Sequence, residues 1–448
     1  MSIISVDNNK VLGRIKPVHS CVGITTLSPR SEIKWAGNVL SYMNEMGMPF
    51  TRLNGVGGEY GSMTYVDVSN IFRNFDADET VAANYDFTFT DWLVRECFER
   101  GVKPIYRLGV TKEKDHWLKA YNIYPPKDYE KFTRICERII LHYNSGWNGG
   151  YKFDIRQWEI WDGPDNAREI KDNACWKGTK EQYFELYGVV ARKLKKRFPW
   201  LQFGGYGASG FNLDDKNDYS SEFLNDFLNY VTAEETKAPF DFFTWNSTSA
   251  DVETNAKVAK YIREKLDNAG LTECESICGS WNSKILDCTD NKNASVIADN
   301  LIGWQNCQVN KAMYDTCWSG IEYGLFGLTI NRQTVPSYGF YAMKAFNALY
   351  RLGFQVETIS DDEDVNAVSA ASFDKVAVMV VNRTSEPKEV EIRLKDVKRN
   401  KSTVTIINKV DLTGLTYDDL FNIILPKKAL GALKFTMKPN EVRLYEFE

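Results

Sequence analysis

The stretch Trp158-Glu159-Ile160-Trp161-Asp162-Gly163-Pro164-Asp165 decides how the fold of this chain is interpreted. Residues 157–161 are predicted to form a short buried strand, and the polar Asp-Gly-Pro-Asp run that follows marks its carboxyl end. In barrels of parallel strands, functional side chains lie at the carboxyl ends of the strands. Positions 162 and 163 are therefore the first place to look for chemistry.

Short apolar runs alternate with amphipathic segments of helical period on both sides of this strand, from about residue 16 to residue 351. This alternation is typical of repeated β-α units in a parallel sheet, and it predicts an α/β fold built as a (β/α)8 TIM barrel. The predicted strands are 101–109, 157–161, 202–206, 240–245, 275–278 and 312–318. The predicted helices are 128–143, 180–198, 221–231, 251–268, 294–308 and 338–350.

Beyond residue 351 the helical period disappears and β-rich runs replace it. We predict strands at 367–372, 376–381, 389–394, 403–408 and 441–447. The expected domains are a barrel over 16–351 and a C-terminal antiparallel β-sandwich over 352–448, with residues 1–15 as an N-terminal segment that is a candidate part of the sandwich.

Composition limits the classes of function that fit the chain. Its 448 residues are 43% hydrophobic, and a formal net charge of -5 is spread without a basic stripe, so neither nucleic acid nor a membrane is expected as a partner. The start of the chain lacks the pattern of a secretory signal, which predicts a cytoplasmic protein. Nine irregularly spaced cysteines predict reduced thiols, and we expect no cofactor and no metal site.

Several segments in order along the chain resemble glycoside hydrolase family 39, the β-xylosidase and α-L-iduronidase type of clan A barrel. They are 66–72, 84–88, 106–109, 142–144, 158–161, 239–243, 281–283 and 336–338. In this family the strand at 158–165 commonly reads Trp-Glu-Ile-Trp-Asn-Glu-Pro-Asp, and the Glu before Pro is the general acid/base. This chain has Gly163 there, which carries no proton.

The resemblance also locates the nucleophile. The family's strand reads roughly Gly-Leu-Pro-Asp-x-Glu-x-x-x-Thr-Glu-Trp-Asn-Ser, and residues 270–283 align with it without a gap, which places Ser280 at the nucleophile position. Retaining hydrolysis needs two carboxyl groups about 5 to 5.5 Å apart. Gly163 and Ser280 supply neither, so the resemblance predicts a divergent member without both catalytic glutamates.

Other positions that the family uses to contact sugar have changed as well. Asn54, Asn246 and Thr248 stand where the resemblance places imidazoles and a phenol. Changes at four strand ends favour natural divergence over deliberate inactivation, which would normally replace one or two carboxylates. The engineered alternative stays open at the level of the sequence.

The remaining candidates are polar or aromatic residues near the predicted strand ends. Asp162, in the slot of the family's sugar-binding Asn, is either a hydrogen-bond acceptor or a displaced acid or base, and Glu322 is a weaker candidate for the latter role. Because side chains alternate along a strand, Glu159 is predicted to point to the same side as Trp161 and Gly163, about 13 Å further down the strand than Gly163. We interpret Glu159 as a satisfied polar group of the barrel interior. The candidate ligand-binding set is Asn54, His116, Trp161, Asp162, Asn246, Thr248, Ser280, Trp281 and Trp318.

These observations lead to a carbohydrate-related protein on a family 39-like scaffold that is non-hydrolytic and binds a saccharide. The alternative is an active glycoside hydrolase that uses non-standard carboxylates of the pocket. A third hypothesis is structural association through the barrel mouth or the sandwich. The sequence leaves open which sugar is bound and the oligomeric state.

Overall fold

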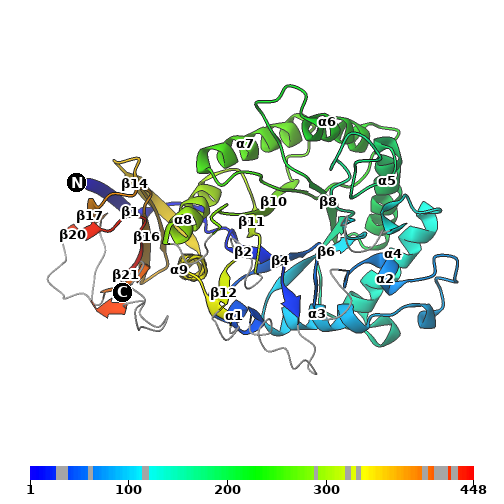
Figure 1. The fold of residues 1–448 in the computed structure, drawn as a ribbon, viewed down its shortest axis with the longest axis horizontal. Helices are drawn as coiled ribbons and strands as arrows, with labels where there is room; N and C mark the ends of the chain where they lie inside the picture. Colours follow the sequence, from blue (N-terminus) through cyan, green and yellow to red (C-terminus); the bar gives the residue numbers. More distant parts are fainter. Residues whose placement is uncertain are drawn as a thin grey trace.

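A computed structural model describes residues 1–26, 39–58, 64–113, 121–286, 291–317, 324–328, 334–395, 402–407, 422–424 and 432–447. Within them a closed eight-stranded barrel lies beside a nine-stranded sheet (Figure 1). The predicted fold class, a TIM barrel with an additional antiparallel β domain, is confirmed.

The barrel strands are parallel and follow one another in chain order around the barrel. They are β2 (Ser20–Val22), β4 (Phe50–Leu53), β6 (Lys103–Leu108), β7 (Gln157–Ile160), β8 (Gln202–Ala208), β9 (Phe242–Trp245), β10 (Glu275–Trp281) and β11 (Lys311–Tyr314). β7 is therefore the fourth strand, and β11, the eighth, lies diametrically opposite to it.

One long helix follows each barrel strand and together these helices form the outer layer. They are α1 (Val39–Met46), α3 (Thr88–Glu99), α4 (Tyr129–Ser145), α5 (Lys180–Arg197), α6 (Tyr219–Thr232), α7 (Val252–Asn268), α8 (Asn291–Asn306) and α9 (Tyr338–Leu352). The shorter elements are α2 (Val68–Ile71), the 3-10 turns Ala82–Asn84, Tyr121–Ile123 and Trp147–Gly149, and the ribbons β3 (Thr25–Thr26) with β5 (Gly57–Gly58) and β12 (Phe326–Leu328) with β13 (Thr334–Pro336).

Local sequence explains where several of these helices begin. The Asp128 side chain accepts a hydrogen bond from the Lys131 backbone N–H at the start of α4, and Thr179 and Gln182 form a reciprocal capping box at the start of α5. The predicted apolar stripe of α4, residues 132, 135, 136, 139 and 140, is buried against the barrel. Caps and stripe together fix both the start of the helix and the face that it buries.

The barrel interior is built in layers, as parallel barrels require. An apolar layer of Val22, Ile105, Phe242, Ile277 and Met313 fills the middle of the barrel. Above it, towards the carboxyl ends of the strands, lies a fully buried polar layer that contains Arg52, Arg107, Glu159 and Thr244. The barrel is thus a packed core, and open space begins only above this polar layer.

The nine-stranded sheet has the order β19-β18-β21-β16-β15-β14-β1-β17-β20 and is antiparallel except for the pair β1 and β17. Its strands are β1 (Ser2–Arg14), β14 (Phe354–Ser360), β15 (Val365–Ala371), β16 (Val376–Asn382), β17 (Lys388–Lys395), β18 (Ser402–Ile407), β19 (Asn422–Ile424), β20 (Ala432–Met437) and β21 (Val442–Phe447). The N-terminal strand thus pairs with strands from the end of the chain.

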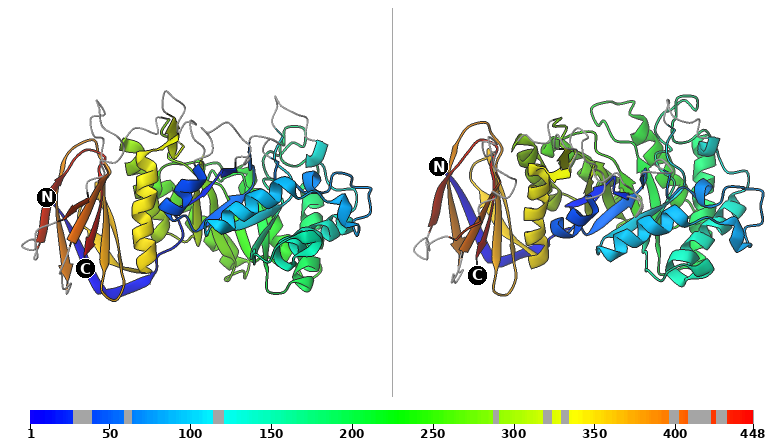
Figure 2. Two further views of the ribbon diagram at one scale, coloured as in Figure 1. Left: turned by 90° about the horizontal axis from the view of Figure 1, so that it is seen from below. Right: turned by 60° about the horizontal axis from the view of Figure 1, so that its bottom comes forward.

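Strand β16 shows why this sheet packs against the barrel. Its even-numbered residues Val376, Val378 and Val380 pack in the core of the curled sheet, and its odd-numbered residues Ala377 and Met379 join the core that includes α8 and α9. Figure 2 shows the sheet standing against α9 in both views. A strand buried on both faces therefore couples the two halves of the molecule.

Candidate functional site

A cavity of about 600 Å³ opens at the carboxyl ends of the barrel strands. Every one of the eight strands, or the residues directly after it, contributes to its wall. The lining residues are Val22, Gly23, Asn54, Gly55, Thr111, Lys112, Asp162, Gly163, Asn166, Cys175, Gly207, Ser209, Asn246, Ser247, Ser280, Trp281, Asn282, Lys284, Asp315 and Thr316. Its volume falls within the range of small-molecule sites, and its wall is rich in hydrogen-bonding side chains.

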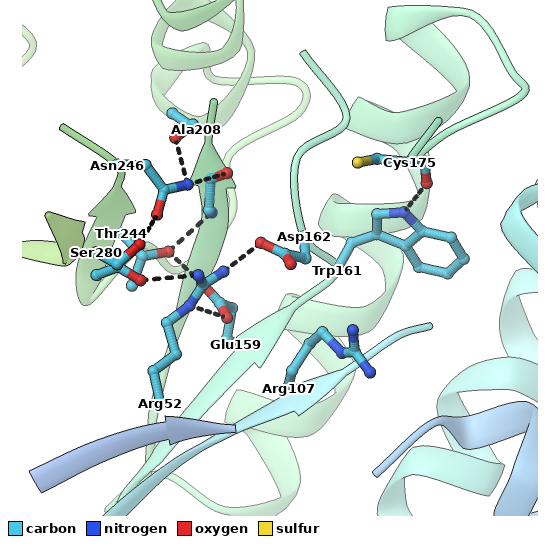
Figure 3. A network of polar contacts seen from close by, with 12 residues as sticks. Arg52, Arg107, Glu159, Trp161, Asp162, Cys175, Ala208, Thr244, Asn246 and Ser280 are labelled. Atoms are coloured by element: carbon cyan, nitrogen blue, oxygen red, sulfur yellow. Dashed lines mark hydrogen bonds and ion pairs between the residues drawn. The ribbon is translucent and has the colours of Figure 1, made fainter. Parts of the chain in front are cut away.

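The floor of the cavity is organised by the fully buried guanidinium of Arg52 (Figure 3). Its Nε donates to Glu159 Oε2 at 2.7 Å, its Nη1 donates to the Gly279 carbonyl at 3.0 Å, and its Nη2 forms an ion pair with Asp162 Oδ1. The Thr244 hydroxyl donates to the other oxygen of Glu159. One cation therefore holds two carboxylates.

Burial raises the pKa of Glu159, and the nearby Asp162 carboxylate raises it further, while Arg52 lowers it. Burial alone would lower the pKa of Arg52, but Asp162 and Glu159 outweigh that effect and the net shift is upward. Glu159 is thus a satisfied polar group of the barrel interior, as predicted, and the guanidinium stays charged.

The backbone at Trp161 changes which side chains face the cavity. Trp161 has a φ of 70°, in the left-handed region, so the alternation of β7 is interrupted there. Asp162 consequently points to Arg52 beside Glu159, whereas the Trp161 indole turns outward and donates to the Cys175 carbonyl at 2.9 Å (Figure 3). The indole also packs edge-on against Trp176. The predicted shared parity of Glu159 and Trp161 is therefore wrong, and Trp161 does not line the cavity.

Gly163 lines the cavity in a conformation that side chains rarely adopt. Its φ is 64°, and a Cβ at this position would lie 3.1 Å from Cys175 Sγ. Burial raises the pKa of the Cys175 thiol to about 12, so this sulfur is a neutral group and not a thiolate nucleophile. The loop after β7 therefore fills, with Cys175, the space next to residue 163.

Gly207 on β8 permits the ion pair on the floor. A Cβ there would overlap both Asp162 Oδ1 and Arg52 Nη2, and its φ of 65° also favours glycine. The Gly207 backbone N–H donates to the Thr244 hydroxyl at 2.8 Å. The fifth strand thus approaches the network closely because it carries no side chain at this point.

Ser280 lies on the wall contributed by β10. Its hydroxyl donates to Asn246 Oδ1 at 3.2 Å, and the Asn246 amide donates to the Ala208 carbonyl at 2.9 Å. No histidine or carboxylate is hydrogen-bonded to Ser280 in the described part of the chain, and no histidine lines the cavity there. Within the described residues, the geometry gives this serine no base that would activate it.

The structure brings some of the predicted residues together and places others elsewhere. Asn54, Asp162, Gly163, Asn246, Ser280 and Trp281 all line the cavity. Thr248 is exposed and lies outside the lining, where its methyl group approaches Gly210. His116, Trp318 and Glu322 lie outside the residues that the structure describes.

Sequence reasoning missed a second carboxylate and two cations of the cavity wall. Asp315 follows β11, and Lys112 and Lys284 follow β6 and β10. Burial raises the pKa of Asp315, and Lys112 and Lys284 offset part of that rise. The signal that could have identified Asp315 is its position directly after a barrel strand. The predicted strand continued to Trp318, whereas β11 ends at Tyr314, so Asp315 was assigned to the strand and not to the loop after it.

Asp165 anchors the loop after β7 to its surroundings. Its carboxylate accepts from the Ser209 backbone N–H at 3.1 Å and from the Ser220 hydroxyl at 2.6 Å. Burial raises its pKa to about 6. This buried group holds the loop to β8 and α6 and does not line the cavity.

Among the residues that the structure describes, no group of three or more His, Cys, Asp or Glu side chains is arranged to hold a metal ion. None of the helices built from these residues has the length and apolar character needed to cross a membrane.

Together, the barrel, its packed interior and the polar cavity at the carboxyl ends of its strands define a (β/α)8 barrel with a small-molecule-sized site in the usual place for this fold. Residues 2–271 match the family model described as glycosyl hydrolases family 39. Because this match covers more than half of the chain, the chain belongs to glycosyl hydrolase family 39.

Two relatives agree with this assignment. A β-xylosidase of Geobacillus stearothermophilus is 24% identical over 275 residues, which cover 60% of this chain and 49% of the relative. A β-xylosidase of Caldicellulosiruptor saccharolyticus is 28% identical over 211 residues, 45% of this chain and 39% of the relative. The matches thus span about half or less of the length of these curated relatives.

Solved structures show the same fold over the whole chain. A glucosidase from Croceicoccus marinus superposes with a TM-score of 0.76 at 18% identity, covering 100% of this chain and 98% of that one. A monomeric β-xylosidase from Caulobacter crescentus gives a TM-score of 0.70 at 18% identity, covering 100% and 99%. At these identities the likeness concerns the fold alone.

Proposed function

We propose that this protein binds a saccharide in the barrel-mouth cavity and does not hydrolyse it. The observation that carries the proposal is that residue 163, where the family resemblance expects the acid/base glutamate, is a glycine with no side chain. Gly163 has a left-handed backbone, and Cys175 Sγ occupies the adjoining space. A side chain at this position would be strained by the left-handed backbone and would press on Cys175 Sγ.

The nucleophile side of the cavity supports the same proposal. Ser280, at the position where the resemblance expects the second glutamate, is hydrogen-bonded to an asparagine. The nearby Asp162 carboxylate is held by Arg52, so it is poorly placed to accept or deliver a proton at a glycosidic oxygen. A cavity lined by asparagine, serine and lysine side chains still offers many partners for sugar hydroxyl groups.

Calorimetric titration with xylobiose, cellobiose, arabinose and glucuronic acid tests the binding half of the proposal. We expect saturable binding of at least one of these saccharides with a dissociation constant below the millimolar range. The absence of heat for all of them up to millimolar ligand would overturn it. Light scattering of the same sample gives the oligomeric state and tests the third hypothesis of association through the barrel mouth or the sheet.

A second candidate function, hydrolysis by non-standard carboxylates, is favoured by one observation. Asp162 and Asp315 line one cavity from opposite strands, and burial raises the pKa of Asp315, as a proton donor would require. Assays with nitrophenyl glycosides and natural oligosaccharides separate the two functions. Turnover that disappears in both Asp162→Asn and Asp315→Asn would establish hydrolysis, whereas no turnover on any substrate favours binding alone.

A further inference from the structure

The two carboxylates of the cavity wall occupy opposite sides of the mouth. Asp162 follows the fourth strand, β7, and Asp315 follows the eighth strand, β11, half a turn away around the closed barrel. Both line the same cavity. Any ligand that fills the mouth therefore has one carboxylate on each side.

The two sides differ in how the negative charge is compensated. Asp162 has a direct ion pair with the buried Arg52 guanidinium. Asp315 has no such ion pair among the described residues: Thr316 donates a hydrogen bond to it, and the charges of Lys112 and Lys284 act on it from the cavity wall. A carboxylate has about four acceptor sites, so Asp315 keeps acceptor capacity for ligand donors.

We infer that Asp315, with Lys112 and Lys284, is the recognition centre for the saccharide and accepts hydrogen bonds from neighbouring hydroxyl groups of a neutral sugar. This inference rests on the proposed binding function and locates it on the β11 side of the mouth. Lys112 and Lys284 are exposed at the wall, so their ammonium groups can donate to sugar hydroxyl or ring oxygens.

The charge balance indicates a neutral ligand. Four cationic side chains, Arg52, Arg107, Lys112 and Lys284, are matched by four carboxylates in the cavity wall and the layer beneath it: Asp162, Glu159, Asp315 and Asp67, the ion-pair partner of Arg107. An acidic sugar would add an uncompensated charge next to Asp315. A neutral sugar offers hydroxyl groups that act both as donors to Asp315 and as acceptors from the lysines.

The test is calorimetric titration of the full chain with xylobiose and cellobiose, with glucuronic acid as the acidic probe. We expect Asp315→Asn to weaken binding of the neutral disaccharides about 10- to 100-fold, because hydrogen bonds to a charged acceptor are lost. Lys112→Met and Lys284→Met should each weaken it about 3- to 10-fold. Glucuronic acid should bind more weakly than either neutral probe.

Matched controls lie away from the cavity. Lys257→Met on α7 and Asp374→Asn in the turn before β16 change the same residue types at exposed positions, and binding should stay unchanged. Unfolding temperatures show whether Asp315→Asn still folds. If it does not, the double variant of Lys112→Met and Lys284→Met decides the question, because both residues are exposed.

The outcomes separate the two proposals. If the unmodified protein binds none of the probes, the proposed function fails and this inference fails with it. If it binds a saccharide but Asp315→Asn and both lysine variants bind equally well, the recognition centre is elsewhere and only this inference is overturned. Preferred binding of glucuronic acid would overturn the neutral-ligand part.

Discussion

The β7 side and the β11 side of the barrel mouth each carry an aspartate carboxylate, but the negative charge is compensated differently on the two sides. On the β7 side, Asp162 is tied to Arg52 above a packed polar layer, and the loop behind it is fixed by Asp165 and Cys175. On the β11 side, Asp315 faces the cavity with two exposed lysines near it. A carboxylate in an active-site position can therefore be structural, and the way its charge is compensated distinguishes it from a carboxylate that is available to a ligand.

The largest expected effect comes from removing the cation on the β7 side. Arg52→Met leaves Glu159 and Asp162 in a buried layer without their shared guanidinium, so we expect the free energy of unfolding to fall by about 3 to 5 kcal/mol. Urea unfolding followed by tryptophan fluorescence measures this loss. Arg156→Met, which removes an exposed partner of Asp154, is the matched control and should change the unfolding midpoint far less.

A pH titration of stability tests whether Asp165 anchors the same side. Its pKa is raised from 3.8 to about 6 by burial, so folding favours the protonated form. That contribution is complete below about pH 3.8 and is lost as the pH rises through about 6. Between pH 4 and pH 7 the unmodified protein should lose about 2 kcal/mol of stability relative to Asp165→Asn.

The control for this prediction is the pH dependence of the variant itself. Asparagine does not titrate, so the difference between the two stability curves isolates Asp165 from other groups. Parallel curves between pH 4 and pH 7 would mean that the carboxylate titrates equally in the folded and unfolded chains, and the assigned cause would be wrong.

A smaller effect is expected at residue 163. Gly163→Ala should lower the free energy of unfolding by about 1 to 2 kcal/mol, because alanine at a φ of 64° is strained and its Cβ would lie 3.1 Å from Cys175 Sγ. Gly270→Ala is the matched control, since Gly270 has a φ of 76° and nothing within 4 Å of the added Cβ. A greater loss for Gly163→Ala reports the contact with Cys175.

The same position gives a functional readout. Gly163→Glu restores the residue that the family resemblance expects, yet the backbone there is left-handed, Cys175 Sγ adjoins it and Ser280 supplies no second carboxylate, so we expect no turnover of nitrophenyl xylosides. Measurable hydrolysis by this single variant would show that the β7 side retains a working active-site geometry, and the comparison between the two sides would break down.

The smallest expected effect comes from the two lysines of the wall, Lys112 after β6 and Lys284 after β10. Lys112→Met and Lys284→Met should each change the free energy of unfolding by no more than about 0.5 kcal/mol, because exposed side chains contribute little to stability. Together with weakened saccharide binding, this result would separate ligand recognition from folding. A large loss of stability in either variant would show that the substituted lysine is structural as well.

Much of the fold was predictable because hydrophobic period is a local property. The α4 and α5 helices were expected at 128–143 and 180–198 and lie at 129–145 and 180–197, where caps and apolar stripes agree. Strands β14 and β20 were missed. β14 is half-buried or exposed at every position except Val356, and β20 carries lysine and threonine among its apolar residues, so neither presents a continuous apolar run.

The candidate site was predictable only in part. Position after a strand identified Asn54, Asp162, Asn246 and Ser280 as cavity residues, and all of them line it. Trp161 failed because its left-handed backbone, which the residue type does not reveal, turns the indole away from the mouth. Asp315 was hidden because the end of β11 was placed a few residues too late.

The sequence by itself determined the family resemblance, the alternation of strands and helices in the barrel, and several of the residues that follow its strands, because periodicity and motif spacing are encoded over short stretches of chain. Only the tertiary structure decided that Arg52 joins Glu159 and Asp162, that Cys175 fills the space at Gly163, and that Asp315 faces Asp162 across the mouth. Arg52, Asp162 and Asp315 are far apart in sequence. They meet because closing the barrel and reversing the backbone at Trp161 bring their side chains to one layer.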